Sequence, residues 1–398
     1  MKLIQVKILS CFFLLILIAS GCSARTNLNP EIPLDEDFEY ERDMNIQELT
    51  WTGFKSVAAC PKGIYFTIAD YLMFYDFASG NTVFVCNKPN CLHDKETDQL
   101  IGQECNAYLG NASYGGLVNI APLFYQNGKL YMIQAVIDFE TTQIAQHFQL
   151  LEIDLDGNNR DVIFTFDNPV NEIILHRGYG YFVTHGKIGK IDLTKKETFE
   201  LFEWEGIENI GNLFAIEDDL YFSAELANID SQTYYGALLS YNLNTDKISV
   251  ISENVGSNVN PIGDHRFAFA RNGKTYILDS ETGNTEYLSE DAGQVFFTND
   301  YLFVYNGISS QGNTEESLHL SVYNKETLEL LAETTLIPGT KICASAAHGN
   351  SLYVYYNDPE DYFSTERLYE ISYEQKEIVQ KIFCEKHPND NKIQGYRY

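Results

Sequence analysis

Three cysteines and one histidine lie close together in the sequence, at Cys86, Cys91, His93 and Cys105. Three thiolates and one imidazole match the Cys₃His ligand set of tetrahedral zinc sites. Four, one and eleven residues separate the successive ligands, which is not the spacing of a standard zinc finger. The same cysteines could instead form a disulfide with one thiol left over, and the location argued below slightly favours the disulfide. The sequence therefore predicts either a disulfide or a structural zinc site here, and no other cofactor.

The chain carries none of the common catalytic motifs. Gly-x-Ser-x-Gly, His-Glu-x-x-His, Gly-x-x-x-x-Gly-Lys and Gly-x-Gly-x-x-Gly are all missing. The eight histidines are scattered, and carboxylates are too abundant for their spacing to select a pair. Residues 154–159 look like a calcium loop, but they lack the alternating acids and the distal Glu of an EF-hand. They fall where a hairpin turn is expected, so we predict a turn and no catalytic residue.

The first residues read as an export signal. Lys2 and Lys7 precede an apolar run from residue 8 to residue 19, which is typical of a signal peptide over residues 1–21. Ala19-Ser20-Gly21-Cys22 resembles the lipobox of bacterial lipoproteins, in which the Cys thiol receives diacylglycerol and the Cys becomes the new N-terminus after cleavage. This predicts lipidation of Cys22 and an extracytoplasmic chain held on the cell membrane by its lipid. Residues 22–48, with an acidic run from Asp35 to Asp43, are expected to form a polar tether.

The net charge of the chain restricts the classes of partner that it can bind. The 398 residues include 27 basic and 56 acidic ones, for a net charge of −29. Cleavage of the signal peptide removes Lys2 and Lys7 and leaves 25 basic residues, so the mature chain carries −31. Nucleic-acid binding needs clustered Lys and Arg and is excluded. Besides the membrane, reached through the lipid, we expect an unknown extracellular ligand or envelope protein as partner, and a monomeric chain.

A repeated pattern predicts the elements that position these residues. A short apolar strand with an aromatic follows a turn residue seven times, at 63–66, 129–132, 180–183, 219–222, 266–269, 301–304 and 351–354. From Tyr65 to Tyr353 the average step is 48 residues. A second strand follows each copy, and six of the seven end in Asp or Asn, whose side chains start turns. A third strand follows the second one, and an apolar run that would form the remaining strand of the unit usually precedes each copy.

Four short strands repeated every 40–50 residues are typical of a β-propeller. We predict an all-β fold with one propeller domain over residues 49–398. Seven blades are expected; six or eight remain open, because the third unit, at 178–204, is short. Cys60 should end an inner strand, away from Cys86, Cys91, Cys105, Cys343 and Cys384. No helical period follows residue 22, which excludes Rossmann, kinase and TIM-barrel folds.

One local motif also resembles a known family. The run Cys86-Asn87-Lys88-Pro89-Asn90-Cys91-Leu92-His93, followed by Cys105-Asn106-Ala107, resembles the Cys-x-x-Pro-x-Cys-x-His…Cys-x-Ala segment of uncharacterised propeller lipoproteins of anaerobic Firmicutes. The preceding residues 75–80 are also similar to theirs. The resemblance implies a propeller and a lipid anchor and brings no activity with it. The interval from Cys86 to Cys105 is longer than in the usual form of the motif.

These observations favour a non-enzymatic, membrane-anchored binding or scaffold module outside the cytoplasm. Propellers build binding sites from loops of several blades, so no local motif is needed. The alternative is a glycan-active hydrolase or lyase with carboxylates at the mouth of the channel. That enzyme would need a channel-facing pair of Asp or Glu about 5–10 Å apart.

Overall fold

The computed structural model describes most of the chain after Met44. The described residues are 44–45, 56–68, 71–89, 91, 93, 105–109, 117–138, 143–166, 168, 170, 172–184, 186–202, 207–228, 233–256, 259–263, 265–290, 292–306, 318–336, 341–357, 366–386 and 393–394. The predicted signal peptide and Cys22 lie outside them. In the described part of the chain, no helix is long and apolar enough to cross a membrane.

Seven antiparallel sheets form the blades, each from four strands that follow one another in the chain. Blades 1 to 4 comprise β2 (Val57–Cys60), β3 (Gly63–Ile68), β4 (Tyr71–Asp76), β5 (Asn81–Phe84); β6 (Leu117–Gln126), β7 (Lys129–Asp138), β8 (Gln143–Asp154), β9 (Asp161–Phe166); β10 (Glu172–His176), β11 (Tyr179–Thr184), β12 (Lys187–Asp192), β13 (Glu197–Phe202); and β14 (Ile207–Ile216), β15 (Asp219–Asn228), β16 (Thr233–Asn242), β17 (Lys247–Glu253). Blades 5 to 7 comprise β18 (Val259–Gly263), β19 (Arg266–Arg271), β20 (Lys274–Asp279), β21 (Thr285–Ser289); β22 (Gln294–Phe297), β23 (Tyr301–Asn306), β24 (Leu318–Asn324), β25 (Leu330–Leu336); and β26 (Lys341–His348), β27 (Ser351–Asn357), β28 (Glu366–Glu374), β29 (Glu377–Lys386).

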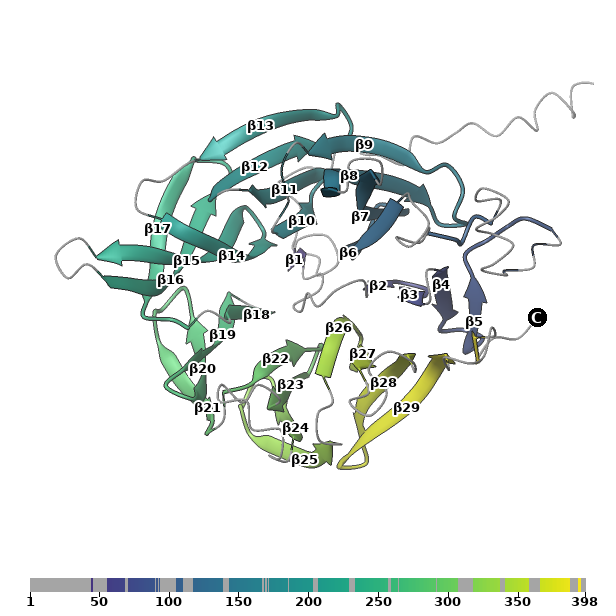
Figure 1. The fold of residues 1–398 in the computed structure, drawn as a ribbon. Coiled ribbons are helices and arrows are strands. Elements are labelled where there is room, and N and C mark those ends of the chain that lie inside the picture. The colour runs from purple at the N-terminus through teal and green to yellow at the C-terminus, as the bar shows by residue number, and fades with distance from the viewer. Residues whose placement is uncertain are drawn as a thin grey trace, which may run out of the picture. The chain divides into compact units, whose positions relative to one another are not determined.

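These sheets form the ring of a seven-bladed β-propeller, which confirms the predicted fold and blade number (Figure 1). Every copy of the sequence pattern lies in the second strand of a blade. The short third unit forms a full blade, β10–β13, whose fourth strand runs from Glu197 to Phe202. The innermost strand β2 contacts both β6 and β26, so the first blade packs beside the last. Among the described strands, none is shared between blades 1 and 7, and the packing of side chains joins these two blades.

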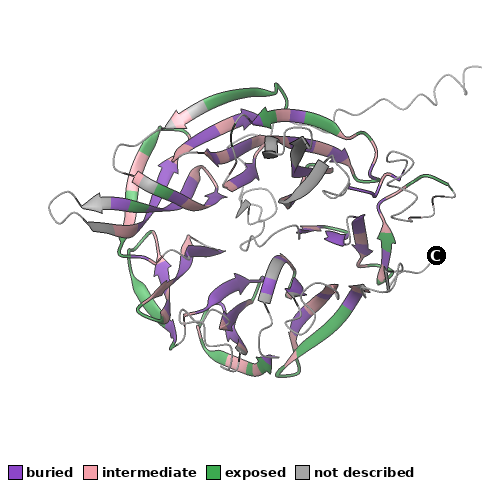
Figure 2. Ribbon diagram, viewed as in Figure 1, coloured by how far each residue is buried: buried purple, intermediate pink, exposed green. Residues whose placement is uncertain are grey.

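The hydrophobic core lies between the blades. Six buried clusters each join neighbouring sheets, because a single four-stranded sheet cannot cover its own two faces. The cluster between blades 7 and 1 combines Val57, Phe66 and Met73 with Tyr355 and Phe383. Exposed residues gather on the outermost strands, which run around the rim (Figure 2). Each of these strands exposes at least one large apolar side chain: Val83, Val162, Phe199, Val250, Tyr287, Leu330, Val379 and Ile382.

Two further strands extend sheets at their edges. β1 (Met44–Asn45) pairs antiparallel with the innermost strand of blade 4, β14, and lies inside the ring (Figure 1). Met44 lies opposite Ile216 and Asn45 opposite Ala215. β30 (Ile393–Gln394) adds to the outermost strand of blade 7, β29. Two residues of the predicted tether, Met44 and Asn45, are thus strand residues of the propeller sheet.

The two ends of the blades differ in the length of their connections. We call the end that joins first to second and third to fourth strands the turn face. Its connections are two to six residues long throughout. We call the other end, which joins second to third strands and successive blades, the loop face. Its connections include 11 residues in blade 6, eight in blade 7 and 32 between blades 1 and 2.

Asp and Asn residues at strand ends fix the turns, as predicted. The Asn324 side-chain oxygen accepts hydrogen bonds from the backbone N–H groups of Glu326 and Thr327, at 2.9 and 2.8 Å. Asp76, Asp192, Asn242 and Asp279 accept equivalent bonds in their own blades. Each turn therefore satisfies backbone donors that the ladder leaves unpaired.

Candidate metal centre

The cysteine-rich segment begins where the outermost strand of blade 1 ends. After β5, the Val85 N–H donates to the carbonyl oxygen of Leu72, at 3.0 Å. The chain returns at Ala107, whose carbonyl accepts a hydrogen bond from the Leu72 N–H at 2.8 Å. Tyr108 then bridges to Tyr71, the first residue of β4. The start of β4 thus holds both ends of the segment, and this brings Cys105 back to Cys86.

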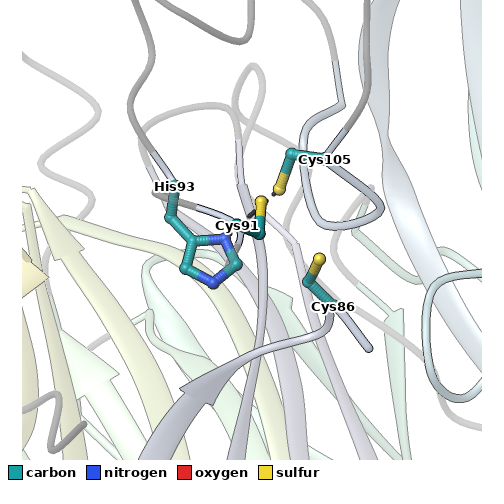
Figure 3. Close-up of side chains that lie close together, drawn as sticks. All are labelled: Cys86, Cys91, His93 and Cys105. Atoms are coloured by element: carbon teal, nitrogen blue, oxygen red, sulfur yellow. Dashed lines mark hydrogen bonds between the residues drawn. The ribbon is translucent and has the colours of Figure 1, made fainter. Parts of the chain in front are cut away.

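Cys86, Cys91, His93 and Cys105 converge on one space, and their ligand atoms all lie within 4.8 Å of one another (Figure 3). The Nδ1 atom of His93 lies 3.3 Å from the Sγ atom of Cys105. The His93 ring stacks on Phe84 with centroids 4.1 Å apart and an interplanar angle of 10°. This stacking and a positive φ of 51° at His93 turn its Nδ1 towards the thiols. The arrangement confirms that the four predicted residues come together.

The four atoms are spaced for a tetrahedral metal. Zinc bonds of about 2.3 Å to sulfur and 2.0–2.1 Å to nitrogen give tetrahedral edges of about 3.6–3.8 Å. All four ligand atoms lie within 4.8 Å of one another, and the His93 Nδ1 to Cys105 Sγ distance of 3.3 Å is close to such an edge. The cluster could therefore hold a metal ion with four protein ligands, which leaves no open position for substrate.

The three thiols differ in their acidity. Burial alone would raise the pKa of Cys86, but the backbone N–H groups of Lys88 and Asn106 hold its pKa below the ordinary value. Burial raises the pKa of Cys91 and, further, that of Cys105, and the nearby charge of Cys86 adds to the rise at Cys105. A cation bound among them would stabilise the thiolates that burial disfavours.

A polar network joins the metal-ligand segment to the hairpin turn of blade 2. The Asn87 side-chain N–H donates to Asp156 at 2.8 Å, and the Asn106 side-chain N–H donates to Asn87 at 2.9 Å and to Asn158. The Arg160 guanidinium donates to the carbonyl oxygens of Tyr108, at 2.7 Å, and Asn106. The segment is thereby fixed to the neighbouring blade.

Gly157 makes the approach of that turn possible. It has a φ of +81°, and a Cβ atom there would lie 2.3 Å from the carbonyl oxygen of Val85. Residues 154–159 therefore form the hairpin turn that the sequence predicts: β8 ends at Asp154, and β9 begins at Asp161. No sequence pattern indicated that this turn contacts the cysteine-rich segment.

The order of the strands predicts that Cys60 lies away from the other cysteines, and the described positions agree with this. Cys60 ends the inner strand β2 and packs in the core between blades 1 and 2, with Leu130 and Met132. Cys384 is buried in the core between blades 7 and 1, the same cluster as Cys105. Among the described side chains, Cys86, Cys91 and Cys105 are free thiols. The Cys343 side chain lies outside the described part, although its backbone belongs to β26 as predicted.

Sequence reasoning missed one half-buried carboxyl, Glu172. Glu172 begins the inner strand β10 at the loop face, and burial raises its pKa to about 7, while an N–H donated by Asn212 partly opposes the rise. Asn212 and Asn209 have positive φ values of 47° and 39° at two irregularities of β14. An acidic residue directly before the apolar run 173–175 was the available signal.

No protein-family model and no curated protein matches the chain. Solved structures that resemble it include an oligogalacturonate lyase in complex with manganese, at 11% identity and a TM-score of 0.46, over 74% of this chain and 78% of that one. An oligogalacturonate lyase from Vibrio parahaemolyticus is 14% identical with a TM-score of 0.49, over 71% and 82% of the chains. Hsv2 of Kluyveromyces lactis is 8% identical with a TM-score of 0.45, over 84% and 99%. These similarities assign no ligand to the chain.

Proposed function

We propose that this chain is a lipid-anchored, extracytoplasmic propeller that binds a ligand or an envelope protein at its loop face. The observation that carries the proposal is the difference between the two faces. Every connection of the turn face has six residues or fewer, whereas the loop face carries the connections of 8, 11 and 32 residues. Longer connections are costly to order and, on a rigid scaffold, are where binding residues concentrate.

We further propose that Cys86, Cys91, His93 and Cys105 hold a structural zinc ion. Four protein ligands and no open position fit a structural role, and zinc would supply a cross-link that is independent of redox conditions. Because His93 lies among the three thiols, the arrangement supports zinc over the disulfide that the sequence slightly favoured. The cross-link would hold the start of the longest loop-face connection in place.

Binding can be tested on a glycan and envelope-protein array with the mature chain. The matched variant replaces residues 307–317 and 358–365 by two-residue Asn-Gly turns, which fit antiparallel strand pairs. We expect selective binding by the mature chain and loss of that binding by the variant, with unchanged thermal unfolding. Equal binding by both proteins would contradict a role for these connections.

The anchor is tested by fractionation. Cys22→Ala should leave the chain in the soluble fraction, whereas the unaltered protein stays in the membrane pellet after a high-salt wash, because Cys22 carries the lipid. The variant staying in the washed pellet would show that the apolar segment itself anchors the chain.

Elemental analysis tests the metal. We expect about one zinc per chain, since four ligands complete one tetrahedral site. His93→Ala should lose the zinc, whereas His348→Ala is the matched control, because the His348 ring also packs on a phenylalanine, Phe77, but His348 does not belong to the cluster of ligands found among the described residues. A metal-free protein with a disulfide within residues 86–105 would refute the zinc site.

The raised pKa of Glu172 supports the glycan-active enzyme as a second candidate function. A carboxyl with a pKa of about 7 suits general acid catalysis near neutral pH. Burial causes the rise, and none of the carboxylates that the structure describes contributes to it. Turnover of a polysaccharide panel by the mature chain, and its loss in Glu172→Gln, would favour the enzyme.

A further inference from the structure

Arg160 is a partly buried cation beside the Cys₃His cluster. It follows the hairpin turn of blade 2 and directly precedes β9. Its guanidinium donates hydrogen bonds to the carbonyl oxygens of Tyr108, at 2.7 Å, and of Asn106, the residue after Cys105. None of the described carboxylates pairs with this guanidinium, and the side-chain charges that act on it are those of Cys105 and Cys86.

The position of Arg160 requires a compensating negative charge. Burial lowers the pKa of Arg160, and the charges of Cys105 and Cys86 oppose that change. Carbonyl oxygens carry only partial charges, whereas a nearby anion offsets the free energy that a guanidinium loses when it leaves water. The cluster supplies such an anion only when its sulfur atoms are thiolates. Three neutral thiols, or a disulfide with one neutral thiol, would supply none.

A divalent metal gives the cluster the charge that matches Arg160. Metal binding takes cysteine as the thiolate and histidine as the neutral imidazole. One divalent ion, three thiolates and the neutral His93 ring therefore leave a single net negative charge. A trivalent ion would leave no charge, and a monovalent ion would leave two negative charges. The single positive charge of the guanidinium thus fits a divalent ion.

Hydrogen bonds connect the guanidinium to two of the ligands. One peptide group lies between Asn106 and Ala107; its carbonyl oxygen accepts from Arg160. The N–H of the same peptide group donates to the sulfur of Cys105. The N–H of Asn106 itself donates to Cys86. Because hydrogen bonds in a chain polarise one another, a cation at the carbonyl oxygen strengthens the N–H as a donor to a thiolate.

We propose that Arg160 is a positioning residue that balances the charge of a divalent metal in the Cys₃His cluster and so sets the metal affinity of the site. The inference rests on the metal site of the proposed function and adds the charge that this site requires. Arg160 belongs to blade 2, whereas the ligands follow the last strand of blade 1. The metal affinity therefore depends on the packing of these two blades.

The test measures the zinc affinity of the mature chain by competition with a chromogenic chelator. Arg160→Gln removes the charge and keeps an amide donor, whereas Arg160→Lys keeps the charge and loses the forked pair of donors. Arg177→Gln is the matched control, since Arg177 also joins two blades, through an ion pair with Asp218, but lies at the junction of blades 3 and 4. We expect Arg160→Gln to lower the zinc affinity about 10–100-fold, Arg160→Lys to retain most of it, and the control to leave it unchanged.

A second measurement reports the charge alone. The site is loaded with iron, whose ferrous form leaves one net negative charge in the cluster and whose ferric form leaves none. Loss of a neighbouring cation favours the ferric form. The reduction potential should therefore fall in Arg160→Gln and stay close to that of the unaltered chain in Arg160→Lys.

The outcomes separate this inference from the metal site itself. If Arg160→Gln binds zinc as tightly as the unaltered chain, the inference is overturned and the zinc site stands. Equal losses of affinity in Arg160→Gln and Arg160→Lys would also overturn it, because the hydrogen bonds and not the charge would then matter. If Arg160→Gln does not fold, Arg160→Lys decides alone: retained affinity supports the inference, and a loss of about tenfold or more overturns it. An unaltered chain that binds no zinc would refute the metal site, and the inference with it.

Discussion

Removing the metal from the Cys₃His cluster is expected to lower the midpoint of thermal unfolding by about 4 °C. A ligand present at 100 times its dissociation constant stabilises the folded state by about 2.7 kcal/mol. The propeller from Val57 to Lys386 spans roughly 330 residues, and unfolding at about 2.1 cal/mol/K per residue gives an entropy of about 0.7 kcal/mol/K. Dividing the free energy by this entropy gives the expected shift.

The size of the shift does not by itself distinguish a metal from a disulfide. Closing a loop of about 20 residues, the interval from Cys86 to Cys105, with a disulfide stabilises by about 3.3 kcal/mol. That free energy corresponds to a similar shift of about 5 °C. The reagent distinguishes the two, because a chelator removes zinc and leaves a disulfide intact, whereas a phosphine reductant cleaves only the disulfide.

The assay is calorimetry of the mature chain with chelator, with phosphine reductant, and with neither. We expect the chelator alone to lower the midpoint, and His93→Ala to show the low midpoint without chelator. His348→Ala should lose only a ring contact, about 0.5–1.5 kcal/mol, and keep its response to chelator. The zinc site would be refuted if the reductant lowers the midpoint of thermal unfolding, the chelator leaves it unchanged, and His93→Ala barely alters it.

Three further predictions follow from the described contacts. In the folded chain the pKa of Glu172 is raised from 4.5 to about 7, so its contribution to stability is full below pH 4.5 and is lost as pH rises to about 7. Chemical denaturation should therefore show that the free energy of unfolding falls by up to about 3 kcal/mol over this pH range. Glu172→Gln should abolish this pH dependence, whereas the exposed control Glu197→Gln should retain it. Asn324→Ala should lower the free energy of unfolding by about 1 kcal/mol, because two backbone N–H groups lose their acceptor, and Asn324→Asp should restore it. Truncation after residue 340 should give an insoluble product in a sedimentation assay, since it uncovers apolar faces of blades 1 and 6; a soluble fragment that unfolds cooperatively would contradict closure of a single ring.

The fold could be predicted from the sequence because its determinants are local. Aromatic strands after turn residues and Asp or Asn at strand ends recur within each blade, and the blades follow one another without strand exchange. The four cluster residues were also found, since they lie within one connection. The contacts of Asn87 and Asn106 with the blade 2 turn could not be predicted, because they join residues about 50–70 positions apart at a blade junction. β1 was missed for another reason: two residues paired only through their backbone leave no side-chain pattern.

Blades 1 and 7, which contain the first and the last blade strands of the chain, meet at one junction of the ring. Blade 1 is held to blade 7 by packing such as Phe66 against Phe383, whose ring centroids are 5.6 Å apart. The polar network of Asn87 and Asn106 fixes the end of blade 1 to blade 2 on its other side. β1 joins the segment before blade 1 to blade 4 across the channel, and β30 extends the edge of blade 7. A metal in the Cys₃His cluster would therefore stabilise blade 1, which, like blade 7, the chain joins to only one neighbouring blade.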